Sequence, residues 1–102
     1  MKIFVIGDEI TIHSFQLVGV DGKIVSPDTE PLDLLNILNE AFSNKENGLI
    51  VVNRFVQKNL GDKFESFLTS AQPLVFVVPD TDEEIQEENL NQYIQQVIGI
   101  KL

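Results

Sequence analysis

Short apolar runs alternate with longer amphipathic segments along the chain. Three of the runs are apolar at every position: residues 3–6, 49–52 and 74–78. Continuous apolar runs of this length are typical of strands that are buried on both faces of a sheet. A fourth run, residues 23–25, is short and lies between Asp21-Gly22 and Pro27, so it is predicted to be an edge strand.

The segments between these runs have helical spacing. The clearest helix has Asp28 or Thr29 as its predicted N-cap and Pro31 in its first turn. Its apolar residues recur on one face: Leu34, Leu35, Leu38, Ala41 and Phe42. A shorter helix from about residue 11 has Ile10, Ile12, Phe15, Leu17 and Val18 as its apolar positions and stops at Gly19. Residues 56–68 form a third helical stretch, which Gly61 is predicted to split or bend.

The last predicted helix begins with Thr81 and Glu84 in capping-box spacing. Five apolar residues form a stripe along it: Leu90, Tyr93, Ile94, Val97 and Ile98. Ile100 and Leu102 continue the apolar pattern. Packing on the chain's own sheet explains such a stripe, and so does docking on another protein; both interpretations stay open.

Strands that alternate with helices, and that are continuously apolar, predict an α/β fold with a mostly parallel sheet. Right-handed crossovers with one reversal give four strands in the order 2-1-3-4, a receiver-like or flavodoxin-like sheet flanked by helices. We expect one small domain, with residues 1–79 forming the sheet region and residues 80–102 forming an acidic-start C-terminal helix and tail. A chain of 102 residues is too short for two independent cores.

The charge balance excludes some classes of partner. Sixteen acidic against seven basic residues give a net charge of −9, which is unfavourable for binding nucleic acid or an anionic membrane surface. Six of the acids lie within residues 80–88, without which the net charge is only −3. This acidic stretch is either a solvated helix start, favoured by the helix dipole, or an electrostatic guide for a basic partner.

Cysteine is absent, which excludes disulfides, zinc thiolate sites and thiol nucleophiles. The apolar run at the N-terminus is too short for a signal peptide, and no run is long enough to span a membrane. We therefore expect a cytoplasmic protein without direct membrane insertion.

In a sheet of this type, ligands bind at the carboxyl ends of the strands. The loops there carry Asp8 and Glu9, Asn53 and Arg54, and Asp80. A phospho-acceptor receiver would need an Asp near the position of Asn53, and an amide cannot be an aspartyl nucleophile. The simpler interpretation of Asp8-Glu9 is a solvated pair at a helix start.

Other catalytic patterns are also missing. The sequence has neither a Gly-x-Gly-x-x-Gly run nor a P-loop ending. The one histidine, His13, has no orienting partner near it in sequence, and no serine lies in a Gly-x-Ser-x-Gly elbow. We expect no catalytic residue, no metal and no cofactor.

Residues 7–20 resemble the N-terminal signature of the F subunit of the V-type and archaeal-type rotary ATPases. The matching residues are Gly7, Asp8, Glu9, Thr11, Phe15, Leu17, Gly19 and Val20. Residues 97–102, Val-Ile-Gly-Ile-Lys-Leu, are similar to the closing pattern of that family. Ile10 and Ser14 depart from it, since the family usually has Asp and Gly there.

The resemblance implies a non-catalytic component of the central rotor stalk. Such a component binds the coiled coil of the D subunit, and through it is linked to the catalytic A/B hexamer and the membrane rotor. It helps to couple ATP synthesis or hydrolysis to proton or sodium ion transport, as a peripheral part of the complex. We expect the stripe from Leu90 to Ile98 to contribute to partner binding. The alternatives are a receiver-like interaction switch without a phospho-acceptor Asp and, third, a small-molecule enzyme.

Overall fold

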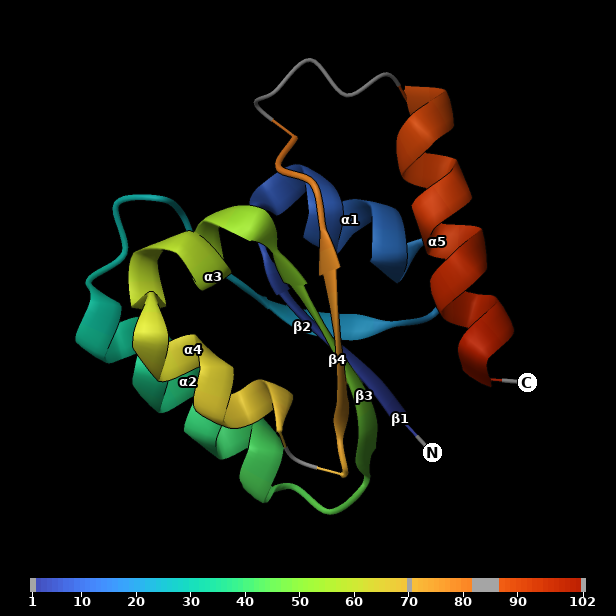
Figure 1. The fold of residues 1–102 in the computed structure, drawn as a ribbon. Helices are drawn as coiled ribbons and strands as arrows, with labels where there is room; N and C mark the ends of the chain where they lie inside the picture. The colour runs from blue at the N-terminus through green and yellow to red at the C-terminus, as the bar shows by residue number, and fades with distance from the viewer. Residues whose placement is uncertain (1, 70, 82–86, 102) are drawn as a thin grey trace.

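The computed structural model describes residues 2–69, 71–81 and 87–101. In these ranges the chain forms a parallel sheet with helices on both faces (Figure 1). The elements follow in the order β1 (Lys2–Gly7), α1 (Glu9–Gln16), β2 (Asp21–Ile24), α2 (Pro31–Ser43), β3 (Asn47–Asn53), α3 (Arg54–Leu60), α4 (Asp62–Leu68), β4 (Leu74–Val78) and α5 (Glu87–Lys101). The predicted α/β class is confirmed.

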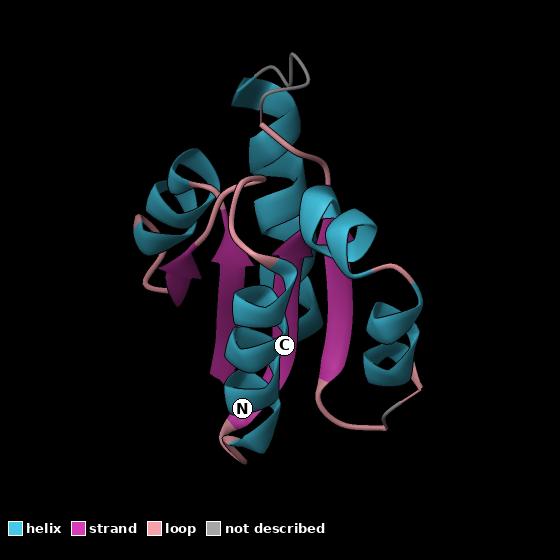
Figure 2. Cartoon of the chain, turned by 90° about the vertical axis from the view of Figure 1, so that its left-hand side faces the viewer, coloured by secondary structure: helices cyan, strands magenta, loops and turns pink. Residues whose placement is uncertain are grey.

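The sheet has the predicted strand order, β2-β1-β3-β4, and all three pairings are parallel. Val51 in β3 lies between Val5 of β1 and Phe76 of β4. Figure 2 shows the strands side by side with their arrowheads at the same end of the sheet. The carboxyl ends of β1, β3 and β4 therefore lie together, which decides where the loops after these strands meet.

The sheet separates two apolar cores. The first lies under α2, α3 and α4, and its fully buried members include Ile6, Leu34, Leu38, Ile50, Val52 and Val56. The second lies under α1 and α5, and its members include Val5, Ile12, Phe15, Leu49, Val51 and Val78. Because β1 and β3 contribute to both cores, their continuous apolar runs follow directly from burial on two faces.

Gly61 separates two helices, as the sequence predicted. Its φ of +56° lies in a region that residues with a Cβ rarely adopt. The Gly61 N–H donates to the carbonyl of Gln57 at 3.0 Å and closes α3, and the Gly61 carbonyl accepts from the N–H of Phe64 at 3.0 Å in α4. The glycine therefore turns the chain from one short helix into the next.

Two predicted boundaries were wrong. β2 covers Asp21–Ile24 rather than residues 23–25, because the strand begins in register with Phe4 of β1. The N-cap of α2 is Glu30, whose side chain makes no capping bond, while Pro31 is the first helical residue as expected. Thr29 instead accepts a hydrogen bond from the N–H of Ser26 at 2.9 Å, so its side chain stabilises the preceding turn.

Candidate functional site

Asp8, Asn53, Asp80 and Thr81 lie together at the carboxyl edge of the sheet, Asn53 as the last residue of β3 and the others in the loops that follow β1 and β4. We call these four residues, with Thr11 of α1, the strand-end cluster. The sequence pattern predicted the first three in loops at this edge. The sequence named Thr11 only through the family resemblance and Thr81 only as a predicted helix start, and the bonds of their hydroxyl groups in this cluster could be recognised only from the fold.

Asn53 is the centre of the strand-end cluster. It is fully buried. Its Oδ1 accepts from the backbone N–H of Asp8 at 2.7 Å, while its Nδ2 donates to the carbonyl of Pro79 at 3.0 Å and to Oγ1 of Thr11 at 3.2 Å. One side chain thus joins the ends of three strands, since its partners follow β1 and β4 and lie in α1.

Both oxygens of the Asp8 carboxylate accept hydrogen bonds. Oδ1 accepts from the N–H of Thr11 at 2.8 Å, which makes Asp8 the N-cap of α1. Oδ2 accepts from the Thr81 hydroxyl at 2.6 Å and from the Thr81 N–H at 3.3 Å. The interpretation of Asp8 as a helix-start residue is confirmed, although its carboxylate also holds the chain that follows β4.

Asp80 does not belong to an exposed acidic surface. Only 7% of its surface is exposed, and its Oδ1 accepts from the N–H of Phe55 at 2.9 Å in the first turn of α3. Its inclusion in a solvated helix start was therefore wrong. The other acids of that stretch, including Glu84 of the predicted capping box, lie outside the described residues and side chains, so the capping box is not tested.

The polar side chains of the cluster bind groups of their own chain. Among the described residues, every buried side-chain nitrogen or oxygen has a hydrogen-bond partner. The same residues contain no group of three or more His, Cys, Asp or Glu that could hold a metal ion. Gly7 packs closely against this network, because a Cβ at this position would overlap Oδ1 of Asn53. This arrangement stabilises the place where the three strands end.

The apolar stripe of α5 faces the sheet. Leu90, Ile94 and Val97 are buried in the second core, and Tyr93 and Ile98 are half-buried against it. α5 therefore runs along the face of the sheet that α1 also covers (Figure 1). The opposite side of the helix is exposed and carries uncharged amides: Asn91, Gln92, Gln95 and Gln96. Packing on the chain's own sheet accounts for three of the five predicted partner-binding residues in this conformation.

The residues of the N-terminal signature divide into two groups. Asp8 and Thr11 form hydrogen bonds in the cluster, Phe15 is fully buried, and Gly19 has a φ of +82° in the turn before β2. Leu17, by contrast, is 88% exposed, and Glu9 is also exposed.

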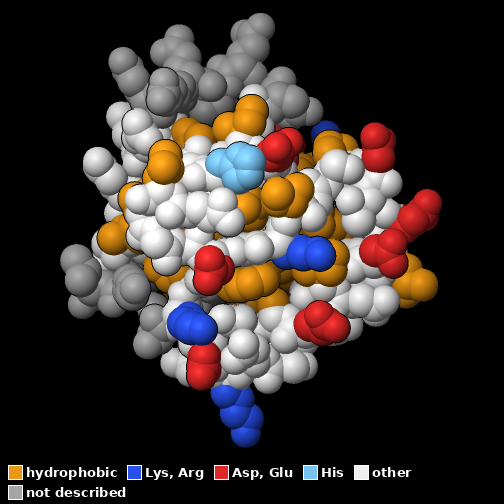
Figure 3. All heavy atoms as spheres, turned by 180° about the vertical axis from the view of Figure 1, so that it is seen from behind, with side chains coloured by type: hydrophobic (Ala, Val, Ile, Leu, Met, Phe, Trp, Pro, Cys, Tyr) orange, Lys and Arg blue, Asp and Glu red, His pale blue; other side chains and the backbone are white. Residues whose placement is uncertain are grey.

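Several apolar side chains predicted to line the first helix lie on the surface instead. Ile12 is buried, but Ile10 and Val18 are more than half exposed. The helix ends at Gln16, so Leu17 and Val18 lie in the turn that follows it and cannot continue its buried face. Figure 3, seen from behind, shows hydrophobic side chains gathered on the surface around a basic side chain, with carboxylates near them.

No helix in the described ranges combines the length and the apolar character that crossing a bilayer requires. A sequence model of the family described as "ATP synthase (F/14-kDa) subunit" matches residues 3–98. Over 107 aligned residues, the chain is 35% identical to the F subunit of the A-type ATP synthase of Thermococcus onnurineus (strain NA1), covering 100% of this chain and 98% of that relative. It is 32% identical over 106 residues to the protein of the same name from Thermococcus kodakarensis (strain ATCC BAA-918 / JCM 12380 / KOD1), with the same coverage.

Proposed function

The chain belongs to the ATP synthase (F/14-kDa) subunit family, and we propose that it acts as the F subunit in the central stalk of an A-type or V-type ATPase. The full-length likeness to two proteins named as the F subunit of an A-type ATP synthase carries this proposal. In this role the chain is not an enzyme by itself. It helps to couple ATP synthesis or hydrolysis in the catalytic hexamer to ion transport through the membrane rotor.

The strand-end cluster supports a mechanical rather than a catalytic role. Its polar groups bind one another, with Asn53 bound to Asp8, Thr11 and Pro79. Buried polar networks of this kind rigidify a fold when every member is satisfied. A protein that must keep a fixed shape while it is bound to a moving shaft gains from such rigidity.

We propose the D subunit, through its coiled coil, as the direct partner, and α5 as part of the contact. Tyr93 and Ile98 are half-buried, so each keeps a surface that a partner helix can cover. Leu90, Ile94 and Val97 would contact a partner only if α5 left the sheet. Exposing three such side chains costs roughly 5–8 kcal/mol, which a coiled-coil groove would have to offset.

Co-expression with the neighbouring stalk protein tests this proposal. The tagged chain is expected to co-purify with the D subunit and, from native cells, with the two large ATPase subunits. Replacing Tyr93 and Ile98 by Ala removes apolar area at the edge of α5 and is expected to weaken binding to the D subunit by about tenfold or more. The matched control replaces Gln92 and Gln95, which are exposed on the other side of the helix.

Two outcomes would contradict the proposal at different levels. If none of the ATPase subunits co-purifies with the wild-type chain, the chain is not part of that complex. If the chain co-purifies but the Tyr93→Ala/Ile98→Ala variant binds the D subunit as well as the control does, α5 is not part of the contact. A thermal melt of each variant shows whether the fold is retained.

A further inference from the structure

The outer edge of the sheet at β2 faces an open groove. Within the described ranges β2 has β1 as its only neighbour, so its second edge is unpaired. Three hollows, with volumes of about 190, 270 and 380 Å³, follow this edge. The first two share Phe4, Asn44 and Asn47, and the last two share Lys23, Ile37 and Glu40. The hollows therefore form one continuous groove between β2 and α2, which we call the β2 groove.

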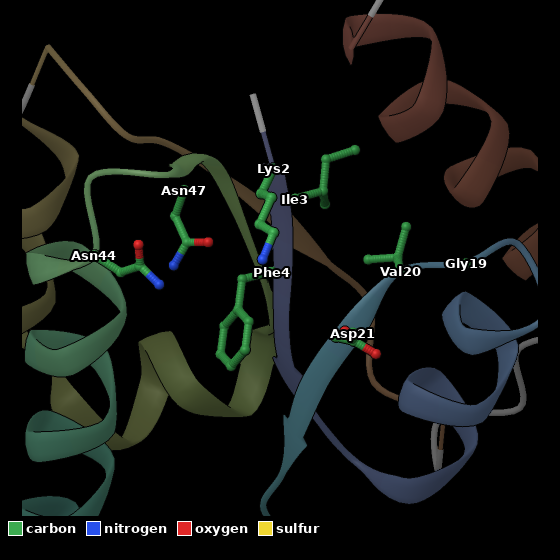
Figure 4. A pocket seen from close by; sticks show the side chains of 8 residues that line it. All are labelled: Lys2, Ile3, Phe4, Gly19, Val20, Asp21, Asn44 and Asn47. Carbon is green, nitrogen blue, oxygen red and sulfur yellow. The ribbon is translucent and has the colours of Figure 1, made fainter.

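One end of the β2 groove, the hollow at the start of β2, is visible at close range. Figure 4 shows Phe4 projecting from β1 toward α2, with Asn44 and Asn47 on the α2 side and Val20 and Asp21 at the start of β2. Phe4 and Ile37 are half-buried and provide apolar floor. A groove between an exposed strand edge and a helix is the arrangement in which an extended peptide adds a strand to a sheet.

The backbone of β2 has free groups on the groove side. The N–H of Val25 donates to the carbonyl of Gly7 at 2.8 Å, so this amide points toward β1. Successive amides of a strand alternate in direction. The N–H and carbonyl of Ile24 therefore point away from β1, toward the unpaired edge, and Ile24 itself is 49% exposed.

The charges along the groove favour a basic occupant. Lys2 forms an ion pair with Glu46 at 3.2 Å, which neutralises the ammonium at one end. The other charged residues that line the hollows are three carboxylates, from Asp21, Asp33 and Glu40, and one ammonium, from Lys23. A segment with Lys or Arg at the α2 side and apolar residues over the floor would complement this surface.

We propose that the β2 groove binds an extended segment of another protein chain, rich in basic and apolar residues, as an additional strand along β2. The occupant is a partner segment rather than a second copy of this chain, because the chain has a net charge of −9 and carboxylates predominate among the charged groups of the groove, so two copies repel each other there. If the chain is a stalk protein, as proposed above, the segment belongs to a neighbouring protein of the same complex.

A short synthetic peptide of alternating Lys and Val tests the groove without the parent complex. The peptide is expected to slow amide exchange in β2 by about tenfold at saturation, and to shift the amide resonances of β2 and of the groove side of α2. Two control peptides are expected to bind about tenfold more weakly: one with Glu in place of Lys, and one N-methylated at alternate residues so that it cannot donate along the edge.

Matched variants place the binding at the edge of β2. Ile24→Pro removes the outward N–H, and proline is tolerated on the open side of an edge strand; Ile24→Val keeps the N–H. We expect the Ile24→Pro variant to bind the Lys-Val peptide about tenfold more weakly than the wild type does. The Ile24→Val variant is expected to bind it as tightly as the wild type does. Should Ile24→Pro fail to fold, Asp33→Lys with Glu40→Lys serves instead, because both side chains are exposed on α2.

Three results would overturn the inference: equal binding by all variants, resonance shifts confined to another face, or pairing of the chain with itself through β2. In the native complex, amides of residues 21–25 are expected to exchange more slowly than in the free chain. If the chain co-purifies with ATPase subunits while these amides exchange at the free rate, the groove proposal fails and the stalk proposal stands. If the peptide binds along β2 but the chain does not co-purify with ATPase subunits, the groove proposal stands and the stalk proposal fails.

Discussion

At the scale of single residues, Asn53 shows how the fold uses the place where a receiver domain has its phospho-acceptor. Its three hydrogen bonds reach groups 26, 42 and 45 residues away in the chain. An amide can donate to a carbonyl and accept from an N–H at once, whereas an ionised carboxylate can only accept. Asparagine is therefore the side chain that joins these loops, and an amide at this place cannot act as an aspartyl nucleophile.

Asn53→Asp is expected to lower the free energy of unfolding by about 2–4 kcal/mol at neutral pH. The new carboxylate cannot donate to the carbonyl of Pro79, so it loses this bond and places a buried charge beside a carbonyl oxygen. Urea denaturation measures the effect, and Asn36→Asp, at an exposed position on α2, is expected to change stability by less than about 0.5 kcal/mol. A loss as small as that of the control would show that the network contributes little.

The amide at this position also separates the stalk proposal from the receiver alternative. Incubation with acetyl phosphate is expected to add no phosphoryl group to the wild type, as measured by intact mass, because an amide cannot act as the nucleophile. A stable phosphoryl adduct on the wild-type chain would favour a signalling module instead.

Gly7→Ala is expected to destabilise the chain by about 1–3 kcal/mol, because the added methyl group overlaps the amide of Asn53. Gly99→Ala is the matched control. Apart from its chain neighbours and the backbone of α5, no atom lies within 4 Å of a Cβ at Gly99, so alanine is expected to stabilise the helix by about 0.5–1 kcal/mol. Thermal melts measure both effects. A shift of the melting temperature in the same direction for both variants would contradict this account.

At the scale of the elements, the apolar runs predicted the strands and their order because burial on two faces leaves a strong pattern. Gly61 likewise revealed the break between α3 and α4. The cap of α2 could not be predicted from the residues before Pro31, because Asp28, Thr29 and Glu30 are all near the helix start and only the turn geometry decides among them. The sequence predicted that Asp8, Asn53 and Asp80 lie at the carboxyl edge of the sheet. It could not predict the hydrogen bonds of the strand-end cluster, because these join side chains that are far apart in the chain.

The start of α3 depends on a residue that follows β4. Asp80→Ala is expected to cost about 1–2 kcal/mol and to speed amide exchange at Phe55, because the first turn of α3 loses its carboxylate acceptor. Asp62→Ala removes an exposed carboxylate from the first turn of α4 and is expected to cost less than about 1 kcal/mol. Unchanged exchange at Phe55 would contradict the capping role.

At the scale of the whole molecule, the sheet needs both of its helical layers. A chain that ends at Pro79 would lose the burial of Leu90, Ile94 and Val97, about 5–8 kcal/mol, which is comparable with the total stability of a domain this size. We expect this truncated chain to bind ANS and to lose its cooperative thermal transition. A sharp transition near that of the wild type would show that α5 is dispensable, and the truncation would then be a clean test of partner binding.

The position of α5 after all four strands also affects biosynthesis. The sheet, with α1 on one face and α2, α3 and α4 on the other, comes earlier in the chain than the helix that covers the rest of the second core. Leu49, Val51 and Val78 therefore reach their full burial only after residues 87–101 have been synthesised and have packed on the sheet. At about 5–20 residues per second, the residues between Val78 and the end of α5 are added within seconds, and an apolar face that is open for such a time is a surface at which nascent chains aggregate.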